Sequence, residues 1–204
     1  MADLQVLEQV ELEQVESEDK TRIHVQDAFA APKLAHDLCR RLRRLGFRGG
    51  ECVLLCIGTD RSTGDCLGPL VGWRLSKVKQ GLFAVYGTLE EPVHAVNLED
   101  KLAAIKIAHP GSLVIAVDAC LGSPENVGSI TVGDGALEPG AGVKKKLPLV
   151  GDIHITGVVN VGGYLEYVVL QNTRLSVVMR MAGVIVEGLK RAAQELTKHQ
   201  AQGA

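Results

Sequence analysis

The chain has 204 residues, of which 46% are hydrophobic and 23% charged, and its formal net charge is -2. This length and composition fit one α/β domain with an appended arm and supply enough apolar mass for a core. The small net charge and an aromatic fraction of 3% argue against nucleic-acid binding, which relies on cationic surfaces and stacking platforms. No apolar stretch approaches the ~20 residues of a membrane-spanning helix, so no membrane partner is expected.

Charge and cysteine content bear on the arm and on the cellular compartment. Residues 1–20 are acidic, with Lys20 as their only base, and we predict an N-terminal arm there, followed by one domain over residues 21–204. A disordered segment and a solvated helix both fit the arm. Five cysteines, several of them in apolar strand-like runs, favour reduced thiols over a disulfide framework, which predicts a cytoplasmic protein.

The first elements are a short strand at residues 23–25 and an amphipathic helix at 32–45. One face of that helix carries Leu34, Leu38, Leu42 and Leu45. Arginines at positions 40, 41, 43 and 44 surround this face, and we interpret them as a solvated basic surface.

Strands and helices then alternate between residues 52 and 118. Strands are predicted at 52–57, 83–86 and 113–117, and helices at 67–77 and 98–107, the second one capped by Asn97. Such alternation, joined by right-handed crossovers, predicts a three-layer α/β/α sandwich with a mostly parallel sheet.

The alternation of strand and helix patterns is less regular in the rest of the chain. Residues 123–150 are rich in Gly and Pro and are predicted to be a mobile loop region that contains a strand at 129–132. A short edge strand is expected at 153–155 and helices at 162–170 and 182–198, while 175–178 fits either a strand or the start of a helix.

The functional argument centres on two aspartates. Asp65 lies in the loop after the first central strand, and Asp118 closes a later strand. Because the carboxyl ends of parallel strands meet at one edge of a sheet, the two carboxylates can converge there. Paired carboxylates differ in proton affinity, so one can act as a base and the other can hold a proton, which activates water for attack on an amide carbonyl. The alternative, that Asp65 only caps the following helix and Asp118 only caps a turn, is equally open.

His154 is a third candidate at this edge. If its short strand reaches the two carboxylates, the three side chains form a divalent metal site suited to Zn or Ni. A purely structural role for this histidine is the alternative. The remaining titratable candidates are interpreted as structural: His94, His109, Cys66 and Cys120.

Two sequence motifs resemble those of a known protein family. The loop Ile57-Gly-Thr-Asp-Arg-Ser-Thr-Gly-Asp-Cys-Leu-Gly-Pro69 and the strand Val114-Ile-Ala-Val-Asp-Ala-Cys-Leu121 resemble the YyaC-type sporulation proteins. Those proteins resemble the core of the germination protease of spore-forming bacteria, whose essential carboxylates match Asp65 and Asp118. The pattern is also similar to the hydrogenase-maturation endopeptidases, whose nickel ligands would fall on the same two aspartates and on His154. The resemblance implies a phosphorylase/hydrolase-like fold and a location in the spore or forespore interior.

The leading expectation is a sporulation-associated, endopeptidase-like hydrolase that uses Asp65 and Asp118 and requires no cofactor. Its substrate would be a protein or peptide, with small spore proteins as candidates. Asp60 and Arg61 are expected to shape the loop or hold substrate, and Gly122 to let a substrate chain approach closely. The alternatives are a Ni- or Zn-dependent maturation-type protease and a non-catalytic binding module on the same scaffold. Self-association into a homo-oligomer is also expected.

Overall fold

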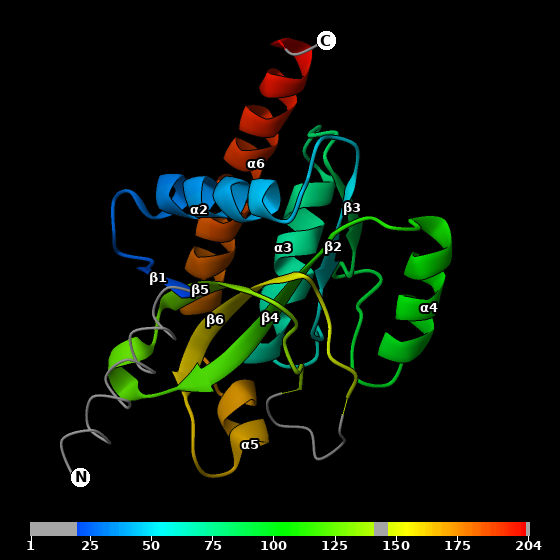
Figure 1. Ribbon diagram of the computed structural model, residues 1–204. Helices are drawn as coiled ribbons and strands as arrows, with labels where there is room; N and C mark the ends of the chain where they lie inside the picture. Colours follow the sequence, from blue (N-terminus) through cyan, green and yellow to red (C-terminus); the bar gives the residue numbers. More distant parts are fainter. Residues whose placement is uncertain (1–19, 141–146, 203–204) are drawn as a thin grey trace, which may run out of the picture.

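Figure 1 shows the computed structural model, which describes residues 20–140 and 147–202. Six strands form one sheet in the order β1-β5-β6-β4-β2-β3. Their bounds are β1 (Lys20–His24), β2 (Cys52–Cys56), β3 (Phe83–Tyr86), β4 (Val114–Gly122), β5 (Ser129–Asp134) and β6 (Ile153–Val161). Strands β3, β2, β4 and β6 are parallel, and β5 and β1 continue the sheet in antiparallel fashion. The predicted mostly parallel sheet is confirmed.

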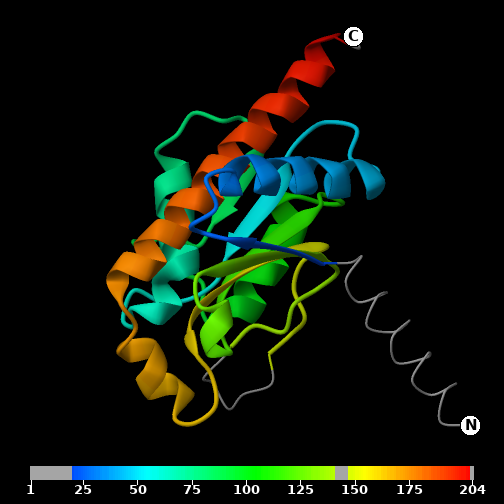
Figure 2. The same ribbon diagram turned by 90° about the vertical axis from the view of Figure 1, so that its left-hand side faces the viewer.

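Helices cover both faces of this sheet (Figures 1 and 2). Helices α2 (Ala30–Arg44), α3 (Leu67–Ser76) and α6 (Leu175–Gln202) pack on one face, and α4 (Leu98–Ala108) packs on the other. Alternate residues of each central strand enter the two cores, since side chains of a strand point to opposite faces. In β2, for example, Leu54 belongs to the first core and Leu55 to the second. The three-layer sandwich is thereby confirmed.

The short helical elements lie at the ends of strands. They are η1 (Gly64–Cys66), η2 (Pro124–Asn126) and α5 (Glu166–Gln171). None of the described helices is both long and apolar enough to cross a membrane. Of the predicted acidic arm, only Lys20 falls within the described residues, where it begins β1. Positions 141–146 of the predicted mobile loop region also lie outside the described residues.

Several predicted elements differ from the observed ones. The edge strand at 153–155 is wrong, because β6 has nine residues and lies inside the sheet between β5 and β4. This long partner keeps β4 paired from Asp118 to Gly122, so β4 does not end at Asp118. The helix expected at 162–170 begins only at Glu166, and the ambiguous stretch 175–178 is the first turn of α6.

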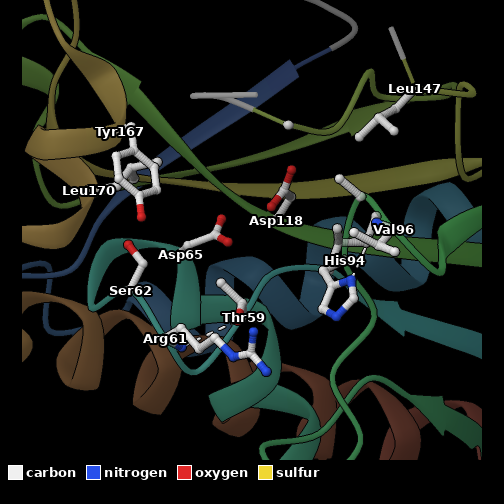
Figure 3. Close-up of a pocket in the computed structure, with 13 residues that line it drawn as sticks. Thr59, Arg61, Ser62, Asp65, His94, Val96, Asp118, Leu147, Tyr167 and Leu170 are labelled. Carbon is white, nitrogen blue, oxygen red and sulfur yellow. Dashed lines mark hydrogen bonds between the residues drawn. The ribbon is translucent and has the colours of Figure 1, made fainter. Parts of the chain in front are cut away.

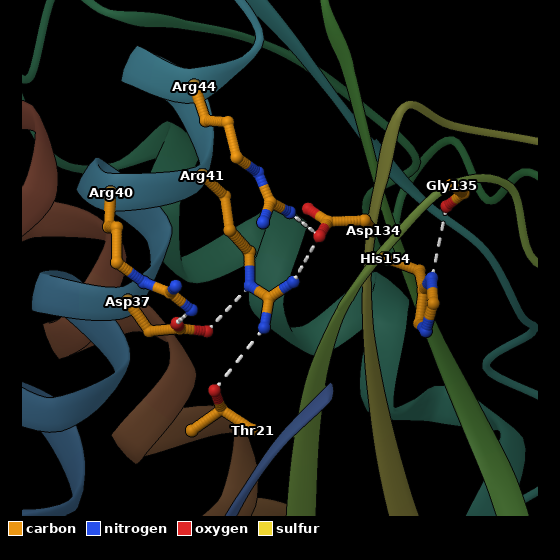
Figure 4. Close-up of polar contacts among 8 residues, drawn as sticks. All are labelled: Thr21, Asp37, Arg40, Arg41, Arg44, Asp134, Gly135 and His154. Atoms are coloured by element: carbon orange, nitrogen blue, oxygen red, sulfur yellow. Dashed lines mark hydrogen bonds and ion pairs between the residues drawn. The ribbon is translucent and has the colours of Figure 1, made fainter. Parts of the chain in front are cut away.

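The predicted solvated basic surface on α2 is wrong for Arg41. Its side chain is fully buried, with Nε 2.7 Å from Asp37 Oδ2 and Nη1 2.8 Å from Asp134 Oδ2 (Figure 4). Arg44 also pairs with Asp134. The two ion pairs with Asp134 connect α2 to the end of β5, and Asp134 is too far along the chain for the helical pattern to reveal them.

Candidate active site

The loop after β2 holds Asp65 through close backbone contacts. Strand β2 ends at Cys56, and the chain turns at Gly58, whose φ of 135° favours glycine. The N–H of Thr59 donates to the carbonyl of Asp65 over 3.1 Å, so the loop closes on itself before α3 begins. A Cβ added to Gly58 would lie 2.0 Å from the same carbonyl oxygen. Both the backbone angle and the close approach therefore require glycine here.

Gly58→Ala is expected to lower the free energy of unfolding by about 3 kcal/mol or more, because the new Cβ collides with the Asp65 carbonyl and φ is unfavourable. The matched control is Gly111→Ala, where φ is 77° and nothing lies within 4 Å of the added atom. That variant should cost only about 1–2 kcal/mol. Urea unfolding of the two purified variants measures the difference, and equal losses would show that the contact does not constrain the loop.

Asp118 lies at the same rim of the sheet as Asp65, where the parallel strands have their carboxyl ends, because β2 is shorter than β4. The last residue pair between them is Cys56 with Val117, so Asp118 is the first residue of β4 beyond the end of β2. Its side chain is buried, and its Oδ1 accepts from the N–H of Ala119 over 2.8 Å. The carboxyl group thus lies at the carboxyl end of the parallel strands although β4 continues past it.

The structure brings the two aspartates together in one cavity. The cavity has a volume of about 470 Å³, and Figure 3 shows the two carboxyl groups facing each other inside it. Its apolar lining comes from Ile57, Ala95, Val96, Leu147 and Leu170. Its other lining residues are Thr59, Arg61, Ser62, His94, Gly140 and Tyr167. A mainly apolar wall around two carboxyl groups lowers the local dielectric constant and so strengthens their electrostatic interaction.

The two carboxyl groups differ in proton affinity. Burial raises the pKa of Asp65 to about 6, against weaker opposing effects of a backbone hydrogen bond from Thr59 and of the charge on His94. Burial and the negative charge of Asp65 raise the pKa of Asp118 well above its usual range. Asp65 is therefore the first of the two to ionise as the pH rises, and its charge makes Asp118 hold its proton longer, which gives the cavity one base and one acid.

The other predicted substrate-binding residues lie in different places. Arg61 lines the cavity with an exposed side chain, and its backbone N–H donates to Thr59 Oγ1 over 3.3 Å. Asp60 is exposed and does not line the cavity, and its Oδ1 accepts from Thr59 Oγ1 over 3.5 Å within the loop. Gly122 does not line it either: an added Cβ would lie 2.9 Å from Val158 Cγ1, so this glycine makes room for a side chain of the protein itself.

The structure does not bring His154 to the two aspartates. In the sheet it pairs with Ala116, two residues before Asp118, so it lies back from the rim. Its ring is buried, and Nδ1 lies 3.0 Å from the carbonyl oxygen of Gly135, to which it donates (Figure 4). Burial also lowers the pKa of His154, which keeps the ring neutral. The expected position of this side chain beside the carboxylates is wrong.

His94 lines the cavity instead. Its Nδ1 accepts from the N–H of Val96 over 3.3 Å, so in this arrangement the ring N–H is on Nε2. Two hydrogen bonds fix the backbone around His94. The N–H of His94 donates to Asn97 Oδ1 over 2.8 Å, and the carbonyl of Val93 accepts from the N–H of Gly58. The Asn97 side chain therefore holds the His94 loop and does not make the capping bond to α4 that had been predicted.

Comparison with known proteins places the chain in a family. A family model described as "Protein of unknown function (DUF1256)" matches residues 22–188. The chain belongs to this family. It is 54% identical over 175 residues to the uncharacterized protein YyaC of Bacillus subtilis (strain 168), and the match covers 85% of this chain and 84% of that protein. The resemblance to YyaC-type proteins is confirmed, and all residues lining the cavity fall inside the DUF1256 match.

Among solved structures, the chain is similar to a NiFe hydrogenase maturation protease, HycI, from Thermococcus kodakarensis KOD1. The TM-score is 0.48 and the sequence identity 19%, and the similarity covers 76% of this chain and 99% of that one.

Proposed function

We propose that this DUF1256 protein is an endopeptidase-like hydrolase in which Asp65 and Asp118 activate a water molecule. The observation that carries the proposal is the pair of carboxyl groups facing each other in one mainly apolar cavity, with raised and unequal pKa values. One ionised and one protonated carboxyl group in the same cavity are the groups that acid–base hydrolysis of an amide needs.

The proposed reaction uses both groups in turn. The ionised Asp65 takes a proton from water while the water oxygen bonds to the amide carbon, and Asp118 gives its proton to the carbonyl oxygen. The resulting diol then loses its amine: the C–N bond breaks, Asp65 protonates the leaving nitrogen, and Asp118 recovers a proton from a diol hydroxyl. The products are a carboxylic acid and an amine, and both aspartates regain their starting states.

Two further groups of the cavity suit a polypeptide substrate. The Nε2–H of His94 can donate to a substrate carbonyl, and the exposed guanidinium of Arg61 can hold a carbonyl or carboxylate at the cavity mouth. A role in sporulation, small spore proteins as substrates, and the spore or forespore interior as location are part of the proposal and rest on the resemblance of the two motifs alone.

The cavity residues do not fit a metal centre of the predicted kind. His154 lies outside the cavity, and within residues 20–140 and 147–202 no three His, Cys, Asp or Glu side chains are arranged to hold a metal ion. We therefore expect excess EDTA to leave the rate of peptide cleavage unchanged. A loss of cleavage that nickel or zinc restores would favour the metal-dependent alternative.

The pH dependence of cleavage tests the proposed roles. We expect kcat/KM to rise with pH through about 6, as Asp65 becomes ionised, and to fall again at higher pH when Asp118 loses its proton. The measurement is cleavage of a library of unstructured peptides, read by mass spectrometry between about pH 4 and about pH 9. A rate that is constant over this range would contradict the assignment of Asp65 as the base.

A further inference from the structure

Helix α5 and the loop before it expose an unusual amount of apolar surface beside the cavity. Tyr164 is 88% exposed, Leu165 65% and Tyr167 61%, and Val168 is also exposed. A second hollow of about 460 Å³ lies against this helix. It is lined by Asn160, Val161, Gly162, Tyr164, Leu165, Val168, Val169 and Asn172, and none of these residues is charged. We call the surface formed by these lining residues and Tyr167 the α5 surface; Glu166, on the same helix, does not line the hollow.

The hollow of the α5 surface and the candidate active site lie on opposite faces of helix α5. Tyr167 and Leu170 line the cavity that holds the two aspartates, while Leu165 and Val168 line the second hollow. Helix α5 is therefore a wall common to both, and a molecule lying across it would reach the cavity mouth. Large contiguous apolar patches on soluble proteins mark interaction sites more often than chance exposure.

Two details indicate that this surface serves a ligand. Leu165 has a φ of 53°, and it is the only described residue other than glycine with a positive φ. This backbone conformation is unfavourable for leucine and displays its side chain to solvent. In addition, Ser62 Oγ, in the cavity, is buried and has no hydrogen-bond partner among the described residues. Figure 3 shows Ser62 on the same side of the cavity as Tyr167, where its hydroxyl group is available to a bound backbone.

We propose that the α5 surface is the docking site of the polypeptide substrate and that it selects an uncharged segment with large apolar side chains. The absence of charge among the residues lining the hollow disfavours acidic or basic segments, which would lose hydration without gaining a partner. The apolar side chains of the segment cover Leu165 and its neighbours, and the adjoining backbone passes Ser62 toward the two carboxyl groups. This inference rests on the proposed hydrolase function, because that function identifies the bound molecule as a polypeptide substrate. Docking itself requires no hydrolysis.

The test measures binding in an Asp118→Asn background, so that the probe is not cleaved. The probe is a fluorescein-labelled, uncharged peptide of Ser and Gly with Leu and Phe at intervals, and fluorescence anisotropy gives its Kd. Leu165→Asn and Tyr164→Ser are each expected to weaken binding by about tenfold, the effect of one lost apolar contact. Asn tolerates a positive φ, and Tyr164 is almost fully exposed, so both variants should fold.

The matched control is Ile107→Ser on α4, whose side chain is 83% exposed but lies outside both hollows. It should leave the Kd unchanged, and a probe with Glu in place of Leu and Phe should bind at least about tenfold more weakly. Equal Kd values for all variants would overturn the proposal. So would a change from oligomer to monomer in Leu165→Asn by light scattering, since the surface would then join copies of the chain. Binding without cleavage by the wild type would contradict the hydrolase function and leave the docking site standing.

Discussion

Replacing either cavity aspartate by asparagine is expected to lower kcat/KM for peptide cleavage by about a thousandfold or more, the range typical of general acid–base groups. In Asp65→Asn the new amide cannot take a proton from water, and in Asp118→Asn it cannot pass one to the substrate. Both variants should fold, because an amide closely matches the shape of a carboxyl group, and burial already favours the uncharged form of Asp118. The measurement is the cleavage rate of one defined peptide near pH 7, with circular dichroism to verify the fold.

The matched control for this comparison is Asp60→Asn. Asp60 belongs to the same loop as Asp65, but its exposed carboxylate does not line the cavity. Its variant should cleave at the wild-type rate. Because the two cavity aspartates act as a unit, the double variant should be no slower than either single one. Full activity in a purified Asp65→Asn or Asp118→Asn protein would refute the pair, and a wild type without any cleavage would favour the binding-module alternative.

The second large effect concerns stability. The pKa of Asp65 is raised from its ordinary 3.8 to about 6 in the folded protein, so the folded state holds this proton more tightly than the unfolded chain does. This tighter binding of the proton contributes its full stabilisation of the folded state below about pH 4, and the contribution is lost as the pH rises through about 6. The side chain introduced by Asp65→Asn carries no charge at any pH. The variant should therefore match the wild type near pH 4 and be more stable by about 1–3 kcal/mol near pH 7.

Urea unfolding at both pH values measures this difference. Asp60→Asn is again the control, and as a surface substitution it should stay within about 0.5 kcal/mol of the wild type throughout. If Asp65→Asn were no more stable than the wild type near pH 7, the carboxyl group of Asp65 would have to be well hydrated in the folded wild-type protein. A gain in stability together with a loss of cleavage would show that the protein retains a destabilising charge for chemistry.

The convergence of Asp65 and Asp118 could be predicted because it depends on a general property of parallel sheets. Both residues follow continuous apolar runs, and such strands end at a common edge. The position of His154 could not be predicted, since it depends on the register between β4 and β6, and periodicity does not encode the partner of a strand.

His94 was missed for a related reason. Val93, beside it, makes a single parallel bridge to Ile57, and one bridging residue leaves no alternating pattern in the sequence. The pairing of Arg41 with Asp134 was equally hidden, because it joins residues of α2 and β5 that are remote along the chain. A signal was present for His94, as Pro92 and Asn97 bracket a loop that follows a short strand, but it identifies a turn and not a cavity wall.

The last helix has a consequence for how the molecule is made. Helix α6 packs on both α2 and α3, and its Gly188 lies so close to Leu34 of α2 that an added Cβ would approach the leucine Cδ2 within 2.5 Å. The part of this face that α6 covers, next to the parts covered by α2 and α3, thus stays exposed until residues 175–202 have been synthesised. Until then the apolar side chains that α6 covers are exposed to solvent in a nascent chain, so this layer of the domain can be completed only after α6 has been synthesised.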